Sequence, residues 1–478
     1  MYDAVIIGAG VVGGMTARLL AQHEGRFCIV ESEGDIAMGA TKANSAIVHA
    51  GFDAKAGSLK AKLNVRGSQM MKQICEDLSV SYINNGSLVV GYSEADKEGL
   101  EVLMENGIKN GVSGLEIIEG DRLRETEPNL GDEVVCALYA PTGAIVCPYE
   151  LTEASIGNAM DNGAELKLNF KVEKIQKREG VFEITAQSGE MIKAKYVINA
   201  AGIYSDKVSE MVGANSFDVH PRRGEYMLLD RECGNTVSHT IFTLPTKMGK
   251  GILVSPTVDG NLILGPTSVD GEDKEDKRTT AEGMNSVAES AKRMVKNIDL
   301  RMVITSFCGL RSVGSTGDFI IEMQDEGFVN VAGIESPGLS ASPAIAEYVA
   351  ELLKANGAAL KPKADFVKTR DSYKNFKNWD IDKKNEIIKK DKAFGNIICR
   401  CEGISEGEIR HAIRTNPKPH DLDGVKRRTR AQMGRCQGGF CSPYIMGILA
   451  EELGENIENI TKSGKGSYIL TNEIKEVQ

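Results

Sequence analysis

The stretch DAVIIGAGVVGG, residues 3–14, decides how this chain begins to fold. Residues 3–7 form a short apolar run, which is typical of a strand buried in a parallel sheet. Gly8, Gly10 and Gly13 follow with GxGxxG spacing, which allows a tight turn and lets backbone N–H groups approach a pyrophosphate. Apolar residues at helical spacing over 12–20 then predict a helix.

A second strand and an acidic residue complete this unit. Residues 27–30, FCIV, predict the strand, and Glu31 stands at its tip, where an acid can bond the ribose of an adenosine. The glycine spacing alone is a weak signal, because glycines that only make turns would explain it. Strand, helix, second strand and terminal acid together predict a dinucleotide-binding βαβ unit.

The composition excludes some classes of function. The chain has 478 residues, enough for roughly two to four domains. Aromatic residues make up only 5%, Trp379 is the single tryptophan and the net charge is -10, so a nucleic-acid partner is not expected. A small anionic substrate remains compatible with this charge, because it needs only a local group of cations.

Targeting signals are not expected either. No basic and apolar leader precedes the first strand, and no apolar run approaches the ~18 residues of a membrane span. The ten cysteines indicate reduced thiols and metal ligands rather than disulfides. We therefore expect a cytoplasmic protein without a transmembrane segment. Peripheral association with a membrane stays open.

The rest of the chain mixes strands and helices. Strands are expected at 87–92, 134–140, within 165–200 and 219–265, and at 318–322 and 328–332, and helices near 94–110, at 280–297 and from Pro337 to Lys354. Nucleotide-binding signals recur near residues 8, 199 and 333. This interleaving predicts an α/β fold with a Rossmann-like nucleotide-binding domain, residues 1–85, 141–215 and 300–357, interrupted by a β-sheet substrate domain, residues 86–140 and 216–299.

The C-terminal part differs in composition. Residues 361–392 carry 11 Lys and Arg against 6 Asp and Glu. This charge predicts a solvated linker over 358–394, with a docking strip for an acidic partner as the alternative. Beyond it, residues 395–478 are expected to form a small helical domain.

Four cysteines in this last domain are paired along the chain, as Cys399-x-Cys401 and Cys436-xxxx-Cys441. Four thiolates bind either tetrahedral zinc or an iron–sulfur cluster, and redox-regulatory thiols are a further alternative. Zinc ribbons usually pair C-xx-C with C-xx-C, so the spacing favours iron and sulfur. The arginines at 427, 428, 430 and 435 are interpreted as charge compensation beside an anionic cluster or as a docking rim, rather than as a nucleic-acid patch.

Three further motifs join the N-terminal one: ATKANSAIVHAGF (40–52), NAAGIYSD (199–206) and GIESPGLSASPA (333–344). Together they resemble the FAD-dependent oxidoreductases of the D-amino-acid oxidase and glycerol-3-phosphate dehydrogenase superfamily, over residues 1–355. The resemblance implies FAD, with Gly8, Gly10 and Gly13 at its pyrophosphate and Glu31 on its ribose. The other implied cofactor contacts are Thr41, Asn44, Ser45, Val172, Ala200, Ala201, Gly202, Gly333, Pro337, Gly338 and Leu339.

The cysteine region resembles a second family. CRCEGIS (399–405) and RTRAQMGRCQGGFC (428–441) are similar to the helical [2Fe–2S] module of bacterioferritin-associated ferredoxin. That module is appended to the large subunit of anaerobic glycerol-3-phosphate dehydrogenases and to several amine or amino-acid dehydrogenases. The resemblance implies that Cys399, Cys401, Cys436 and Cys441 hold a [2Fe–2S] cluster.

Two residues are the first candidates for chemistry. His49 lies inside a flavin-lining motif, and a histidine suits removal of a hydroxyl proton near neutral pH; a purely structural hydrogen bond is the alternative. Arg311 falls where the superfamily often anchors the substrate, and a guanidinium binds carboxylate or phosphate by two bonds; an interdomain salt bridge is the alternative. Weaker candidates are Arg222, Arg223, Lys247, Lys250, Tyr204 and Tyr226.

The resemblance implies a dehydrogenase that oxidises glycerol 3-phosphate to dihydroxyacetone phosphate by hydride transfer to flavin. Electrons would leave through the cluster to a partner protein or an NAD-linked flavoprotein subunit, in a hetero-oligomer. The alternatives are a dehydrogenase of L-2-hydroxyglutarate or another 2-hydroxy acid, and an amine or amino-acid dehydrogenase. A flavoprotein for electron transfer or redox sensing, without an organic substrate, is the non-enzymatic alternative.

Overall fold

A mixed sheet of eight strands is built around the N-terminal strand in the computed structural model, which describes residues 1–214, 216–245, 251–374 and 376–471. Strands β9, β2, β1, β12 and β20 run parallel, while β10, β11 and β19 are antiparallel to their neighbours. The bounds are β1 (Tyr2–Ile7), β2 (Phe27–Val30), β9 (Glu165–Lys167), β10 (Val172–Arg178), β11 (Val181–Ala186), β12 (Met191–Asn199), β19 (Ile320–Asp325) and β20 (Phe328–Ala332).

Helices cover one face of this sheet. They are α1 (Val11–Leu20), α2 (Leu59–Asp77), α5 (Pro148–Asp161) and α8 (Gly338–Ala355). Ile6 of β1 packs into the core shared with these helices, whereas Val5 and Ile7 face the opposite layer around β11. The short α6 (Ser205–Glu210) lies with that opposite layer. Alternate residues of one strand therefore serve two cores, as a sheet covered on both faces requires.

Helix α2 was not expected from the sequence, since its apolar stripe is weak and Gly67 interrupts it. The structure gives this glycine a role: a Cβ atom there would lie 2.2 Å from the Ser340 carbonyl oxygen of α8. Gly67 therefore allows the two helices to pack closely.

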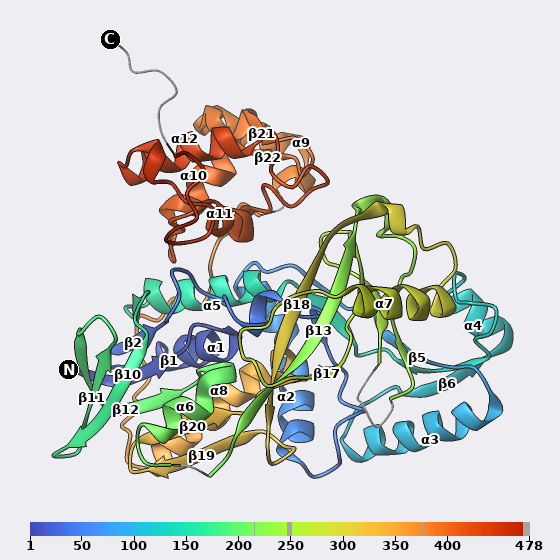
Figure 1. The fold of residues 1–478 in the computed structure, drawn as a ribbon, viewed down its shortest axis with the longest axis horizontal. Helices are drawn as coiled ribbons and strands as arrows, with labels where there is room; N and C mark the ends of the chain where they lie inside the picture. Colours follow the sequence, from blue (N-terminus) through green and yellow to red (C-terminus); the bar gives the residue numbers. More distant parts are fainter. Residues whose placement is uncertain (215, 246–250, 375, 472–478) are drawn as a thin grey trace.

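A second sheet has nine strands and forms the substrate domain (Figure 1). Its order is β17-β13-β16-β15-β14-β5-β7-β6, and β18 pairs with β13. The bounds are β5 (Ser87–Gly91), β6 (Glu116–Glu119), β7 (Cys136–Ala140), β13 (Val219–Leu229), β14 (Thr240–Thr243), β15 (Leu253–Pro256), β16 (Leu262–Gly265), β17 (Val269–Asp270) and β18 (Val303–Gly314). Helices α3 (Glu94–Lys109), α4 (Gly120–Thr126) and α7 (Ala281–Met294) accompany this sheet.

One expected boundary differs from the structure. Residues 303–314 were assigned to the nucleotide-binding domain, but they form β18, which pairs with β13 along almost its whole length. The pairing is not visible in the sequence, because strands β14 to β17 and helix α7 lie between the two strands along the chain. A small sheet of β3 (Ile47–Val48), β8 (Ala144–Val146) and β4 (Tyr82–Ile83) links the two large ones.

The C-terminal domain is small and mostly helical, which confirms the expected fold class. It contains β21 (Ile397–Cys399), β22 (Ile404–Ser405), α10 (Glu406–Arg414), α11 (Leu422–Thr429) and α12 (Ser442–Leu453). Ser405 and Glu408 form a capping box that starts α10. In Figure 1 this domain, orange to red, lies above α5, which α11 contacts. No helix in the described ranges is long and apolar enough to cross a membrane.

The segment before this domain is not a uniformly solvated linker. Lys374 bonds Glu153 and lies 3.9 Å from Glu150, both on α5, and Phe376 is buried. The exposed basic side chains that the composition predicted lie on α9 (Ile381–Lys390) and at Lys361, Lys368 and Lys392. The first half of this segment therefore fastens the C-terminal domain to the nucleotide-binding domain.

Candidate functional site

The glycine turn between β1 and α1 has a backbone that only glycine accommodates. Gly8 has φ of +107°, and a Cβ atom there would lie 2.4 Å from the Ala200 carbonyl oxygen. Gly10 is the N-cap of α1 and supplies no side-chain cap, while Gly13 packs on the Gly8 carbonyl. The turn thus presents bare backbone at a helix N-terminus, which fits the pyrophosphate of a dinucleotide.

Glu31 lies beside this turn. Its carboxylate accepts hydrogen bonds from the N–H groups of Ala9 at 2.8 Å and Glu33 at 3.0 Å. Burial raises the pKa of Glu31, and these N–H groups offset part of that effect. The N–H of Phe170 donates to the Glu31 carbonyl at 2.7 Å, which brings the start of β10 at Val172 to the same region. This is the arrangement that ribose and adenine recognition requires.

The loop after β2 uses its three predicted residues in different ways. Thr41 Oγ1 accepts the N–H of Val11 at 3.0 Å, so it caps the first turn of α1. Asn44 shapes its own loop, since Nδ2 donates to the Thr41 carbonyl at 2.8 Å and Oδ1 accepts the N–H of Ala46 at 2.8 Å. Ser45 Oγ lies 3.2 Å from the Tyr226 hydroxyl, which connects the loop to the substrate sheet.

His49 lies at the N-terminus of α8. Its backbone N–H donates to Ser340 Oγ at 2.7 Å, and its Nε2 lies 3.3 Å from Ser336 Oγ. Its ring also contacts Phe242 of the substrate sheet, with 5.9 Å between centroids. His49 is therefore held at the junction of the two domains. The predicted residues Gly333, Pro337, Gly338 and Leu339 form the turn and first residues of α8 beside it.

Arg311 projects from β18 beside Tyr226. Its Nη1 and Nη2 donate to the Thr267 carbonyl oxygen at 3.3 and 3.2 Å. Among the described residues no carboxylate lies within ion-pair distance of Arg311. Burial raises the pKa of Tyr226, while Arg311 and Ser45 lower it. The alternative role predicted for Arg311, an interdomain salt bridge, therefore finds no carboxylate partner among the described residues.

The weaker candidates are mostly structural. Arg222 bonds both oxygens of Asp270, and Arg223 bonds Glu225 and Asp276. Tyr204 is partly exposed and bonds Glu275. Lys247 and Lys250 lie outside the described residues.

The four C-terminal cysteines come together as two pairs. Cys401 and Cys436 have their Sγ atoms 3.2 Å apart, and Cys399 and Cys441 are both buried. The hydrogen bond with Cys441 lowers the pKa of the Cys399 thiol to about 6 and raises that of Cys441. Backbone N–H groups of Gln432 and Glu402 also lower the pKa of Cys399.

The donor set fits a cluster better than a single ion. Among the described residues, no group of three or more His, Cys, Asp or Glu side chains is arranged to hold one metal ion. The four thiols would supply the four cysteine ligands of a [2Fe–2S] cluster, which would carry out one-electron transfer when bound. Gln432, with φ of +76°, directs its N–H toward both Cys399 and Cys441. Such N–H groups stabilise thiolate ligands and sulfide.

Arg427, Arg428 and Arg430 serve mainly to fix the domain in place, which corrects their interpretation as charge compensation or a docking rim, whereas the side chain of Arg435 stays largely exposed. Arg427 Nη2 bonds Asp35 Oδ2 at 2.5 Å, and Arg428 bonds both oxygens of Asp35 at 2.7 and 2.9 Å. The remaining contacts reach the substrate domain: Arg430 with Asp259 and Asn261, and Arg435 with Asp230 and Glu232. No local sequence pattern marks these partners, because Asp35 lies 393 residues from Arg428 along the chain.

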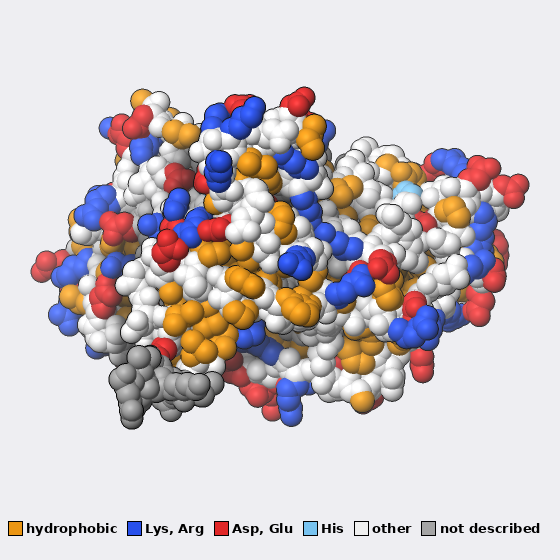
Figure 2. Space-filling model, turned by 90° about the horizontal axis from the view of Figure 1, so that it is seen from above, with side chains coloured by type: hydrophobic (Ala, Val, Ile, Leu, Met, Phe, Trp, Pro, Cys, Tyr) orange, Lys and Arg blue, Asp and Glu red, His pale blue; other side chains and the backbone are white. Residues whose placement is uncertain are grey.

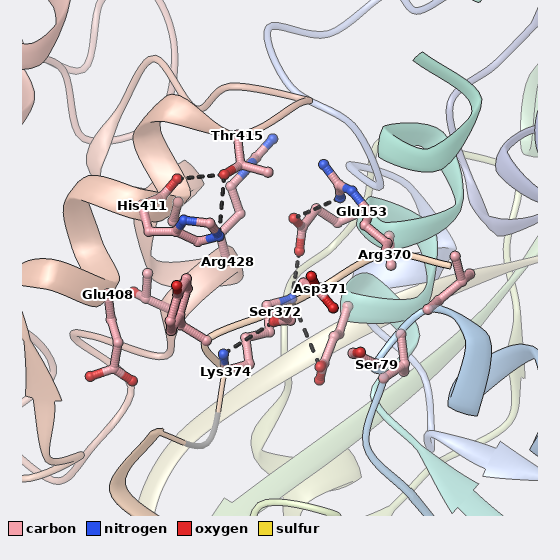
Figure 3. A pocket seen from close by; sticks show the side chains of 17 residues that line it. Ser79, Glu153, Arg370, Asp371, Ser372, Lys374, Glu408, His411, Thr415 and Arg428 are labelled. Atoms are coloured by element: carbon pink, nitrogen blue, oxygen red, sulfur yellow. Dashed lines mark hydrogen bonds and ion pairs between the residues drawn. The ribbon is translucent and has the colours of Figure 1, made fainter. Parts of the chain in front are cut away.

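A polar pocket lies within this interface, between α5, the 370–374 segment and helices α10 and α11 (Figure 3). Its charged side chains are already paired, as Lys374 with Glu153 and Arg370 with Asp161. Burial raises the pKa of Glu150 in its wall to about 7, against the effect of Lys374. None of the residues predicted to bind FAD lines this pocket, so it is an interdomain contact and not the flavin site.

Comparison with known proteins agrees with this geometry. Residues 3–352 match the family model described as FAD dependent oxidoreductase, DAO. The chain belongs to this family of FAD-dependent oxidoreductases. Residues 397–451 match the BFD-like [2Fe-2S] binding domain, so the oxidoreductase carries both a flavin domain and an iron–sulfur domain.

Individual relatives support the same assignment. The oxidoreductase is 47% identical over 481 residues to a glycerol 3-phosphate dehydrogenase of Caloramator mitchellensis, with 100% of both chains covered. A solved structure of L-alpha-glycerophosphate oxidase from Mycoplasma pneumoniae with FAD bound is 30% identical, with a TM-score of 0.74, and the match covers 77% of this chain and 98% of that one. The L-2-hydroxyglutarate dehydrogenase of Bos taurus is 31% identical over 284 residues, 56% of this chain and 61% of that protein.

Proposed function

We propose that this oxidoreductase oxidises glycerol 3-phosphate to dihydroxyacetone phosphate. Two lines support this substrate. The relative that is similar over its full length, through both the flavin and the iron–sulfur domain, is named a glycerol 3-phosphate dehydrogenase. In the site, the guanidinium of Arg311 has no carboxylate partner among the described residues. This observation is the main structural support for an anionic substrate.

Each residue at the site then has one role. Arg311 would bind the phosphate through two parallel N–H···O bonds, and Tyr226 and Ser45 would hold that guanidinium beside the flavin loop. His49 would take the hydroxyl proton as the C–H hydride leaves the same carbon and the carbonyl forms. Ser336 and Ser340 orient His49 for this task. FAD and the cluster, when bound, would supply hydride acceptance and one-electron transfer to a partner protein.

Anaerobic titration of the purified protein tests the substrate. Glycerol 3-phosphate should bleach the flavin absorption, and L-2-hydroxyglutarate and sarcosine should leave it unchanged. Bleaching by L-2-hydroxyglutarate alone would transfer the assignment to the 2-hydroxy acid dehydrogenases. Bleaching by none of the three, with reduction by a reduced partner protein, would favour an electron-transfer flavoprotein.

The proposal also covers the electron acceptor, the cellular location and the domain boundaries. The electrons pass to a partner protein in a hetero-oligomer, because an iron–sulfur domain on a dehydrogenase transfers single electrons to a separate acceptor. The location is cytoplasmic, which the six scattered cysteines support, since all six are free and five are buried. Apart from residues 303–314, the domain boundaries given above are proposed unchanged.

A further inference from the structure

The surface next to the cysteine loops exposes large aromatic side chains. Phe440 is 82% exposed and immediately precedes Cys441. Tyr444 is 66% exposed and lies in the first turn of α12, which Cys441 caps. Cys401 is also exposed and Cys436 half-buried, so this side of the cysteine site reaches the surface. Aromatic residues are enriched in protein–protein interfaces, which makes two exposed rings beside the cysteine loops a candidate contact surface.

The charges beside these rings are basic. Residues 399–403 and 430–444 contain three arginines and one acid, Glu402. Glu402 is buried and paired with Arg231 and Arg430, so it adds little charge to the surface. Arg400 is exposed and has no ion pair among the described residues. Arg435 is also largely exposed, but Asp230 and Glu232 pair with it and neutralise part of its charge. Figure 2 views the molecule from the side of this domain and shows apolar patches among Lys and Arg.

We propose that this cluster face, defined as Arg400, Cys401, Arg435, Phe440 and Tyr444, docks an acidic one-electron carrier protein. The chain as a whole has a net charge of -10, which repels acidic proteins at long range, so an acidic carrier would be favoured only where local basic side chains face it, as on this surface. The two rings would form the dry centre of the contact, and the arginines would orient the carrier around it.

The face also lies close to the cysteines that would hold the cluster, which favours electron transfer to a protein bound there. Electron transfer weakens steeply with distance, and Cys401 is the exposed cysteine of the four. A carrier seated here would touch the cysteine loops directly. Each carrier molecule takes one electron, so two are reduced for every substrate molecule oxidised. The inference rests on the proposed function, because only a dehydrogenase whose electrons leave by this domain needs such a face.

Plant plastocyanin, an acidic one-electron carrier, is the probe for this face, and the basic cytochrome c is its counterpart. With the holoenzyme and glycerol 3-phosphate under anaerobic conditions, we expect plastocyanin to be reduced at least tenfold faster than cytochrome c at low salt. The rate should fall steeply as salt screens the charges. Phe440→Glu and Arg400→Glu should each slow plastocyanin reduction at least tenfold, with flavin bleaching unchanged.

Val102→Glu is the matched control. Val102 is 68% exposed on α3, which packs against β5, β6 and β7, so the change adds the same charge to an apolar surface position in another domain. Plastocyanin reduction by this variant should stay within twofold of wild type. Equal effects of all three variants, or rates that do not respond to salt, would overturn the proposal.

Binding of zinc-substituted plastocyanin, which accepts no electron, separates this inference from the proposed function. If glycerol 3-phosphate fails to bleach the flavin but wild type binds this probe and Phe440→Glu does not, the docking face stands and the substrate assignment fails. If Phe440→Glu abolishes binding to phosphatidylglycerol vesicles and leaves plastocyanin binding intact, the face is a membrane contact and the proposal is wrong.

Discussion

Replacing Asp35 with asparagine should release the iron–sulfur domain from the flavin domain. Asp35 is 4% exposed and receives four hydrogen bonds, one from Arg427, two from Arg428 and one from the N–H of Ile36. Burial would raise the pKa of Asp35, but Arg428 and Arg427 hold it well below its usual range. The carboxylate is therefore charged at neutral pH, and it neutralises two arginines that have little contact with water.

The expected magnitude follows from this burial. Removing one partner of a buried ion pair typically costs about 3–5 kcal/mol, because the remaining charge stays buried without compensation. Such a loss corresponds to a factor of about 10² to 4 × 10³ in the docking equilibrium. Asp423→Asn is the control, because Asp423 lies on α11 together with Arg427 and Arg428. Asp423 pairs with the half-exposed Lys462, and such surface ion pairs contribute only about 0–1 kcal/mol to stability.

Hydrogen exchange measured by mass spectrometry reports this docking. In Asp35→Asn, peptides covering α5 and α11 should exchange much faster than in wild type, while Asp423→Asn should resemble wild type. FAD content must be measured in parallel, because Asp35 lies in the loop after Glu31. Unchanged exchange in Asp35→Asn would refute the argument that this carboxylate holds the domain.

The pH dependence has a defined sign. A carboxylate with a lowered pKa stabilises the folded state above its unfolded value of about 3.9, and this contribution is lost as the pH falls through the folded value. Docking through Asp35 should therefore be constant around neutrality and weaken only in acid. Asp35→Asn should show less of this acid-dependent loss.

Four further changes test other parts of the structure. Arg311→Gln should slow flavin bleaching by glycerol 3-phosphate by about 10²- to 10³-fold through loss of two charged hydrogen bonds, whereas Arg222→Gln should have a much smaller effect. His49→Asn should lower kcat by about 10²- to 10⁴-fold and remove the fall of kcat/KM at low pH, where a base is protonated. Glu150→Gln should flatten the pH dependence of thermal unfolding: because the pKa of Glu150 is raised to about 7, wild type loses stability as the pH rises toward and through that value. Cys436→Ser should remove the iron and the cluster absorption but leave flavin bleaching, and retained iron would contradict the ligand assignment.

Local pattern identified the elements that bind the cofactors. The glycine spacing at residues 8–13 and the acid at Glu31 predicted the βαβ unit, because backbone conformation and strand ends are encoded by neighbouring residues. The cysteine spacing likewise indicated the cluster domain. In contrast, α2 escaped prediction, since the fit of Gly67 against α8 depends on a helix that begins at residue 338.

The sequence by itself thus determined the cofactors and the order of the flavin and iron–sulfur domains, and it predicted the residues that would contact the flavin. Only the tertiary structure decided the rest: that β18 belongs to the substrate sheet, that Arg311 lacks a carboxylate partner among the described residues while Arg222 and Arg223 have one, and that Arg428 binds Asp35. The physical reason is the same in each case. Strand pairing and charge pairing join groups far apart in the chain, and which partner a strand or a buried charge finds depends on the packing of whole domains.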